Sequence, residues 1–160
     1  MTYSISGLSA AHFAPLFNLD DTELAARGAV RVTASASFGF PCRVSLEDAA
    51  EGEQLILLHH TSHDVSTPYR SAYAIYVRAG VAQAEPFIDS TPPIFAGRPL
   101  ALRGFDEGGM LKDAKLALPG MADAAIRDLF DDPRIDYIDV HNAAHGCFAA
   151  RAHRHEERGA

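Results

Sequence analysis

Hydrophobic and polar residues alternate over several short stretches of the chain. Residues 29–36 and 42–46 carry apolar side chains at every second position, whereas residues 55–58 are continuously apolar and residues 73–77 are rich in β-forming types. Successive side chains of a strand point to opposite faces, so a period of two predicts half-buried strands. The continuous run and the β-rich stretch predict two more buried strands.

Two further pairs of strands are separated by short turn sequences. Residues 100–105 and 110–118 flank an Asp-Glu-Gly-Gly turn, and residues 135–141 and 147–153 are joined by Asn-Ala-Ala-His-Gly. Turn residues between two apolar runs are typical of β-hairpins. The sequence therefore predicts that each of these two pairs forms a hairpin.

Helical spacing is clearest in residues 122–130, where apolar residues recur three and four positions apart. A second, short helix is predicted at residues 24–27. Asp20 and Glu23 have the spacing of a capping box before it, and Gly28 supplies a stop.

Strands and hairpins dominate, so the predicted fold class is α+β with a mainly antiparallel, curled or barrel-like sheet and two or three short helices. A β-sandwich is the alternative. Residues 79–98 hold three prolines and read as a long surface loop. We expect a single domain over residues 1–160 with a core at about 4–152, and a flexible tail at 153–160.

Composition excludes several classes of function. The chain has 160 residues and a net charge of −7, which makes binding of nucleic acid unlikely as an activity, and its apolar runs are too short for a membrane span. Residues 1–11 show no secretory signal, so we expect a cytoplasmic protein. Cys42 and Cys147 are then expected as free thiols.

The last predicted hairpin holds a candidate nucleophile. If its loop closes near its ends, His141 and Cys147 face each other or nearly so, with Cβ atoms about 4.5–5.5 Å apart. A protonated His141 would favour the Cys147 thiolate, and Asp139 or Asn142 could orient the ring. The alternative is that Cys147 is a small buried apolar residue and the His-Asn pair bonds the local backbone.

Histidines four residues apart raise the question of a metal site. His59 and His63 have this spacing, as do His141 and His145, and the two cysteines could add ligands for zinc. The spacing is informative on a helix, however, and both pairs fall at strand ends and loops. We predict no metal and no cofactor.

Arginines near predicted strand ends suggest a different site. Arg43, Arg70 and Arg103 could converge on one pocket and bind a carboxylate or phosphate, with Tyr69 and Asn142 beside them. The alternative is that each arginine pairs with a nearby aspartate or is simply exposed.

Five motifs, taken in order, resemble those of a known family. They are FPCRVSL at 40–46, GE at 52–53, TPYR at 67–70, LRGFD at 102–106 and VHNAAHGCF at 140–148. Together they resemble the bacterial proteins grouped as domain of unknown function 1203, over nearly the whole chain from about Ser4 to Arg151. The chain departs from that family at Tyr73 and Ala74, where a Gly-Pro pair is usual.

The resemblance implies no activity, because the family carries none that can be transferred. It favours the arginine and His-Asn-Cys hypotheses over the metal site, because His59 and His145 do not stand out in the family's pattern. The residues that it implies to be part of that pattern are Cys42, Arg43, Tyr69, Arg70, His141, Asn142 and Cys147.

The sequence therefore predicts a small cytoplasmic domain whose polar pocket binds a small anionic ligand, with catalysis by Cys147 and His141 left open. The competing hypothesis is a non-enzymatic structural or protein-interaction domain whose motif residues only fix turns and strand ends. A homodimer is compatible with either. The two hypotheses differ in whether the motif side chains share one cleft.

Overall fold

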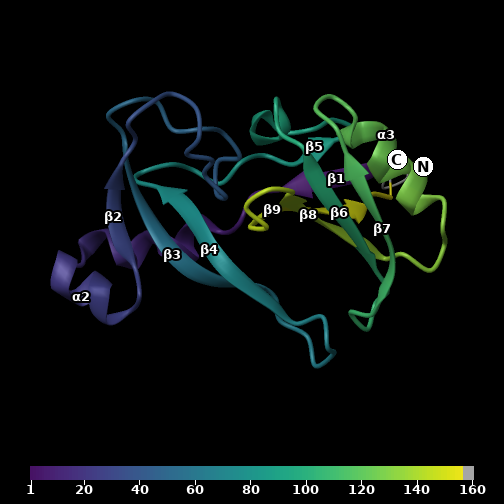
Figure 1. Cartoon of the computed structure of the whole chain (residues 1–160), viewed down its shortest axis with the longest axis horizontal. Helices are drawn as coiled ribbons and strands as arrows, with labels where there is room; N and C mark the ends of the chain where they lie inside the picture. Colours follow the sequence, from purple (N-terminus) through teal and green to yellow (C-terminus); the bar gives the residue numbers. More distant parts are fainter. Residues whose placement is uncertain (157–160) are drawn as a thin grey trace.

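The computed structural model describes residues 1–156 and contains two antiparallel sheets with short helices at their outer sides (Figure 1). The larger sheet has six strands in the order β5-β1-β9-β8-β6-β7. Its strands are β1 (Tyr3–Ser6), β5 (Phe87–Ile88), β6 (Leu100–Phe105), β7 (Leu111–Ala117), β8 (Tyr137–Asn142) and β9 (Phe148–Arg154).

The smaller sheet has three strands in the order β2-β3-β4, namely β2 (Val30–Thr33), β3 (Gln54–His63) and β4 (Ser71–Arg78). The strand predicted at 55–58 is thus the start of a much longer one. Both predicted hairpins are confirmed, since β6 pairs with β7 and β8 pairs with β9.

Short helices cover both sheets. The predicted helix at 122–130 is confirmed as α3 (Ala122–Phe130), and the capping box before α2 (Asp21–Ala26) is present. There, the Asp20 carboxylate accepts from the Glu23 N–H at 2.8 Å, and the Glu23 carboxylate accepts from the Asp20 N–H at 2.8 Å. The remaining helical turns are α1 (Ala10–Phe13), η1 (Ala14–Asn18) and η2 (Pro93–Phe95).

Each sheet buries one face in its own apolar cluster. Ile126 and Phe130 of α3 pack with Ile138 and Val140 of β8 in the larger cluster. Phe13 of α1 belongs to the cluster that covers the smaller sheet. These clusters hold the α+β architecture together, because apolar burial is the main favourable term in folding.

The second face of β8 is also buried, by polar contacts within the larger sheet and one with the smaller sheet. All six residues of β8 are buried. Nε2 of His63, at the end of β3, lies 2.7 Å from the hydroxyl of Tyr137 in β8. The end of β3 therefore meets the larger sheet at the start of β8.

The α+β class and the antiparallel pairing are confirmed, but the expectation of one barrel-like sheet is wrong. The outer strands of the larger sheet, β5 and β7, each pair on one side only within residues 1–156. Closing a barrel requires those two edges to pair with each other. With only two residues, β5 offers almost no edge for such pairing.

Residues 42–46 do not form the predicted strand. Cys42 makes an isolated bridge with Tyr76, and the chain then turns so that the Leu46 N–H donates to the Cys42 carbonyl at 3.0 Å. Leu46 has a positive φ of 57°. The alternation over five residues was too short to distinguish a strand from a tight turn with buried side chains.

Two other segments differ from their predicted structure. The predicted loop at 79–98 contains β5 and η2. Strand β9 continues through His153 and Arg154, which were expected in the tail, while residues 157–160 lie outside the described part of the chain. In residues 1–156, no helix is both long and apolar enough to span a membrane.

Candidate functional site

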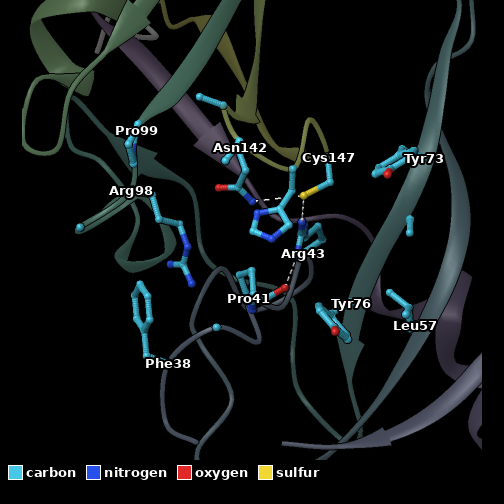
Figure 2. Close-up of a pocket in the computed structure, with 16 residues that line it drawn as sticks. Phe38, Pro41, Arg43, Leu57, Tyr73, Tyr76, Arg98, Pro99, Asn142 and Cys147 are labelled. Atoms are coloured by element: carbon cyan, nitrogen blue, oxygen red, sulfur yellow. Dashed lines mark hydrogen bonds between the residues drawn. The ribbon is translucent and has the colours of Figure 1, made fainter.

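A cavity of about 390 Å³ lies between β3 and β4 on one side and loops that border the larger sheet on the other (Figure 2). Three loop segments contribute to it: the turn around Pro41, residues 97–99, and the connection between β8 and β9. The lining residues are Phe38, Gly39, Pro41, Arg43, Leu57, Tyr73, Ala74, Tyr76, Gly97, Arg98, Pro99, Asn142, Ala143, Ala144, His145 and Cys147.

Three polar side chains meet at one end of this cavity. Nη2 of Arg43 donates to Sγ of Cys147 at 3.1 Å, and Nδ2 of Asn142 donates to the same sulfur at 3.3 Å. Figure 2 shows the three side chains converging from separate segments of the chain. The sequence predicted a shared pocket for these residues, and the fold brings Arg43 within hydrogen-bond distance of a residue 104 positions away.

Arg43 is a buried cation without a carboxylate partner. Arg43 is only 1% exposed. Within residues 1–156, no Asp or Glu oxygen lies within ion-pair distance of its guanidinium. The guanidinium donates to the carbonyls of Phe148, at 2.7 Å, and Pro41. Burial lowers the pKa of Arg43, and the nearby Cys147 sulfur opposes that shift. The local chemistry therefore favours a negative group beside Arg43.

Asn142 has an unused acceptor at the same place. The residue is 8% exposed, and its Oδ1 is buried without a hydrogen-bond partner among the described residues. A buried amide oxygen left unpaired costs about 1–3 kcal/mol. A ligand that offers an O–H or N–H donor would recover this energy.

The walls of the cavity are largely apolar and aromatic. Leu57, Tyr73 and Tyr76 line it from the smaller sheet, and Phe38 lines it from the loop side. Arg98 borders the cavity, but its charge is compensated because it donates to both carboxylate oxygens of Asp48 at 2.7 and 2.9 Å. The cavity thus combines an apolar body with one polar end, as small-molecule sites commonly do.

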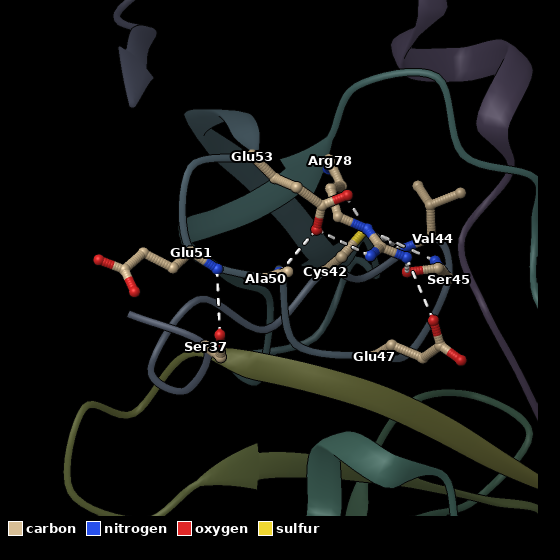
Figure 3. Close-up of polar contacts among 9 residues, drawn as sticks. All are labelled: Ser37, Cys42, Val44, Ser45, Glu47, Ala50, Glu51, Glu53 and Arg78. Carbon is tan, nitrogen blue, oxygen red and sulfur yellow. Dashed lines mark hydrogen bonds and ion pairs between the residues drawn. The ribbon is translucent and has the colours of Figure 1, made fainter. Parts of the chain in front are cut away.

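The segment that carries Arg43 is held by its neighbour Cys42. Sγ of Cys42 accepts backbone N–H groups from Val44, Ser45 and Arg78 at 3.2–3.5 Å (Figure 3). The Arg78 guanidinium then binds Glu47 and Glu53 on the far side of the turn. Cys42 is fully buried, and its contacts stabilise the turn. Its sulfur is therefore not exposed to a ligand.

His141 lies close to Cys147 in the strand register but does not line the cavity. A register shift after Val140 places His141 opposite Phe148, the neighbour of Cys147. Its Nδ1 lies 3.0 Å from the Gly146 carbonyl, and its Nε2 lies 3.4 Å from Arg103. The described contacts include no hydrogen bond between His141 and Cys147. The predicted pairing of base and nucleophile therefore receives no geometric support.

Comparison with known proteins places the chain in a family. The family model described as "Protein of unknown function (DUF1203)" matches residues 39–154. The chain belongs to this family. No curated protein and no solved structure matches it.

The DUF1203 match contains the whole polar end of the cavity, since Arg43, Asn142 and Cys147 all fall within residues 39–154. The resemblance noted from the five motifs is thus confirmed at the level of the family. The match begins near the turn at Pro41 and leaves out β1 and α2.

The other predicted ligand-binding residues lie outside the cavity. Arg70 is exposed and pairs with Asp64 at 3.1 Å. Tyr69 is partly exposed, and its carbonyl lies 2.8 Å from Nδ1 of His63. Arg103 contacts His141 on the face of β6 that meets the smaller sheet. The predicted convergence of three arginines is therefore not what the fold shows, because only Arg43 of these three lines the cavity.

Several lining residues were not predicted from the sequence as ligand-binding residues. Tyr73 and Tyr76 enter only because β4 crosses behind the turn at Cys42, and Arg98 enters through a loop. His145 is exposed and is the histidine that lines the cavity. No group of three or more His, Cys, Asp or Glu side chains within residues 1–156 has the geometry for a metal ion.

Proposed function

We propose that this protein binds a small anionic ligand in the cavity between the two sheets, with the Arg43 guanidinium as the charged contact. The supporting observation is that Arg43 is 1% exposed, lines the cavity and has no carboxylate partner among the described residues. An isolated buried charge is costly, and a bound carboxylate or phosphate would offset that cost.

The shape of the cavity narrows the ligand class. Its volume of about 390 Å³ falls in the range of small-molecule pockets. The aromatic walls formed by Tyr73, Tyr76 and Phe38 suit an apolar body, while Arg43 and Asn142 receive the polar end. A small organic acid such as an aromatic carboxylate fits this combination better than a bare inorganic ion.

Free buried cysteines support the cytoplasmic location that forms part of this proposal. Thiols remain reduced in that compartment. Fractionation of the source cells would test this part separately from ligand binding.

Thermal unfolding of the full-length protein with benzoate, acetate and inorganic phosphate tests the proposal. A ligand that binds only the folded state stabilises it by about 2.7 kcal/mol at a concentration of 100 times its Kd. We expect benzoate to raise the unfolding midpoint in a concentration-dependent manner, with a smaller effect of acetate.

The Arg43→Gln variant should lose this response, whereas Arg70→Gln should keep it, because Arg70 is exposed and paired outside the cavity. If Arg43→Gln does not fold, Asn142→Asp serves instead, since it places a negative charge at the same end of the cavity. Its matched control is Asn18→Asp, an exposed position that does not line the cavity. Absence of any benzoate effect, or equal effects in Arg43→Gln and wild type, would refute the proposal.

A further inference from the structure

We infer that Cys147 is a reactive cysteine whose substrate class is organic hydroperoxides, which oxidise it to a sulfenic acid in the cavity. This goes beyond the proposed ligand binding, because it assigns a covalent step to a different atom of the same site. Three features of the site support this step: the two donors to the sulfur, the unpaired acceptor of Asn142 and the apolar walls.

The sulfur of Cys147 lies where two N–H donors converge. Arg43 Nη2 is 3.1 Å from Sγ and Asn142 Nδ2 is 3.3 Å from it. A thiolate accepts such hydrogen bonds far better than a thiol, and a nearby cation favours it further. Cys147 lines the cavity and is 9% exposed, so a small molecule in the cavity can reach it.

The remaining polar groups match a hydroperoxide. The terminal O–H of a hydroperoxide needs an acceptor, and Asn142 Oδ1 is a buried acceptor without a partner among the described residues. The leaving oxygen becomes negative as the O–O bond breaks, and it needs a donor. Arg43 has five N–H donors, of which its three hydrogen bonds to the protein use one each. The other two make no hydrogen bond among the described residues, and we assign them to that oxygen.

The chemical step balances without a further reagent. The thiolate sulfur attacks the terminal oxygen of R–O–O–H, so that an S–O bond forms and the O–O bond breaks. The sulfur is oxidised by two electrons to S–OH, and the peroxide is reduced to the alkoxide R–O⁻, which takes a proton from water. Guanidinium stabilisation of that developing charge is the same kind of effect as in other oxyanion sites.

The apolar walls of the cavity favour organic hydroperoxides as the substrate. Tyr73, Tyr76 and Leu57 present apolar surface beside Cys147, and this surface would hold the R group. Hydrogen peroxide has no such group and gains nothing from the walls. We therefore expect cumene hydroperoxide to react faster than hydrogen peroxide.

The test uses the full-length reduced protein, mixed with cumene hydroperoxide or hydrogen peroxide in the presence of dimedone, which traps sulfenic acids. Peptide mass spectrometry then gives the rate at each cysteine. One charge-assisted hydrogen bond is worth roughly 1.5–3 kcal/mol, or about ten- to a hundredfold in rate. We expect Cys147 to react with cumene hydroperoxide at least tenfold faster than free cysteine, with Cys42 unlabelled.

The Asn142→Asp variant should react at least tenfold more slowly, because it replaces a donor to sulfur with a negative oxygen, while Asn18→Asp should react like wild type. If Asn142→Asp does not fold, Asn142→Ala is expected to show the same loss. A wild-type rate equal to that of free cysteine, an unchanged rate in the folded Asn142 variant, or equal or faster reaction with hydrogen peroxide would overturn the inference.

A Cys147→Ser variant separates the two proposals. It should lose dimedone labelling and retain the benzoate response, because it keeps Arg43. Failure of benzoate to bind would refute the proposed function. The inference about Cys147 would still be decided by the dimedone labelling rates.

Discussion

The hydroxyl of Tyr137 and Nε2 of His63 lie 2.7 Å apart and form a hydrogen bond between the two sheets. Both groups are buried, and the other ring nitrogen of His63 lies 2.8 Å from the Tyr69 carbonyl. His63 therefore connects the loop between β3 and β4 to the centre of the larger sheet.

Replacement of Tyr137 by Phe should destabilise the protein. The variant leaves a buried imidazole nitrogen unpaired, which costs about 1–3 kcal/mol. Urea unfolding of Tyr137→Phe measures this change in the free energy of unfolding. The control is Tyr73→Phe, because Tyr73 is exposed and should lose little stability. Equal stability of the two variants would show that the hydrogen bond contributes nothing net.

The ion pair between Asp139 and Arg151 should matter more than pairs at the surface. Asp139 is fully buried, and Arg151 donates to its two oxygens at 2.5 and 3.0 Å. Arg151→Met leaves a buried carboxylate unpaired, and we expect a loss of roughly 3 kcal/mol, the lower end of the range for such pairs because Arg151 is partly exposed.

The comparison variant for this prediction is Arg134→Met. Arg134 pairs with Asp132 at the surface, and removal of an exposed pair of this kind changes stability little. Chemical unfolding of both variants compares the two pairs. A loss for Arg151→Met no larger than that for Arg134→Met would contradict the prediction.

Stability should fall as the pH drops below about 7. Burial lowers the pKa of His141 in the folded protein, and the pKa of His60 is lowered for the same reason. The unfolded chain, with histidine pKa values near 6.5, therefore binds protons first. The stabilising contribution is complete above that pH and is lost as the pH falls through it.

Each such histidine contributes a slope of up to about 1.4 kcal/mol per pH unit. Unfolding free energies measured between pH 5 and 8, roughly the range in which histidine titrates, test this expectation. His141→Gln should reduce the slope, whereas His59→Gln, at an exposed position, should not. An unchanged slope in His141→Gln would show that His141 does not titrate differently on folding.

Gly104 should not tolerate a side chain. A Cβ at this position would lie 2.5 Å from Cδ1 of Ile135, which is fully buried. Overpacking of this kind costs typically about 1–3 kcal/mol, so Gly104→Ala should lower the free energy of unfolding. Adding Ile135→Val removes the closest atom and should restore part of the loss. Additive effects of the two substitutions would indicate that they do not interact.

The periodicity of apolar and polar residues predicted those helices and strands that have one apolar and one polar face. The helix at 122–130 and the hairpin of β6 and β7 follow directly from their patterns, because their outer faces remain in water. β8 is buried on both faces, so its polar residues Asp139 and His141 looked like a solvent-facing or catalytic row. Gly104 lies inside β6 against Ile135, and the strand pattern gave no sign of this close packing.

The site was predictable only in part, for a physical reason. Arg43, Asn142 and Cys147 could be named from local motifs, but their contact depends on how the two sheets pack. His141 was placed beside Cys147 from an assumed register; the observed register puts it opposite Phe148, the neighbour of Cys147, but its ring contacts Gly146 and Arg103 instead of the sulfur. Distances between segments follow from tertiary packing, which one sequence does not encode in its local patterns.

The cavity takes its walls from β3 and β4 on one side and from the connection between β8 and β9 on the other. A ligand bound in the cavity consequently contacts two parts of the protein at once, namely the smaller sheet and the β8–β9 half of the molecule. Its binding should slow amide hydrogen exchange in the two sheets together, even in strands that make no contact with it, because separating the halves would first require release of the occupant.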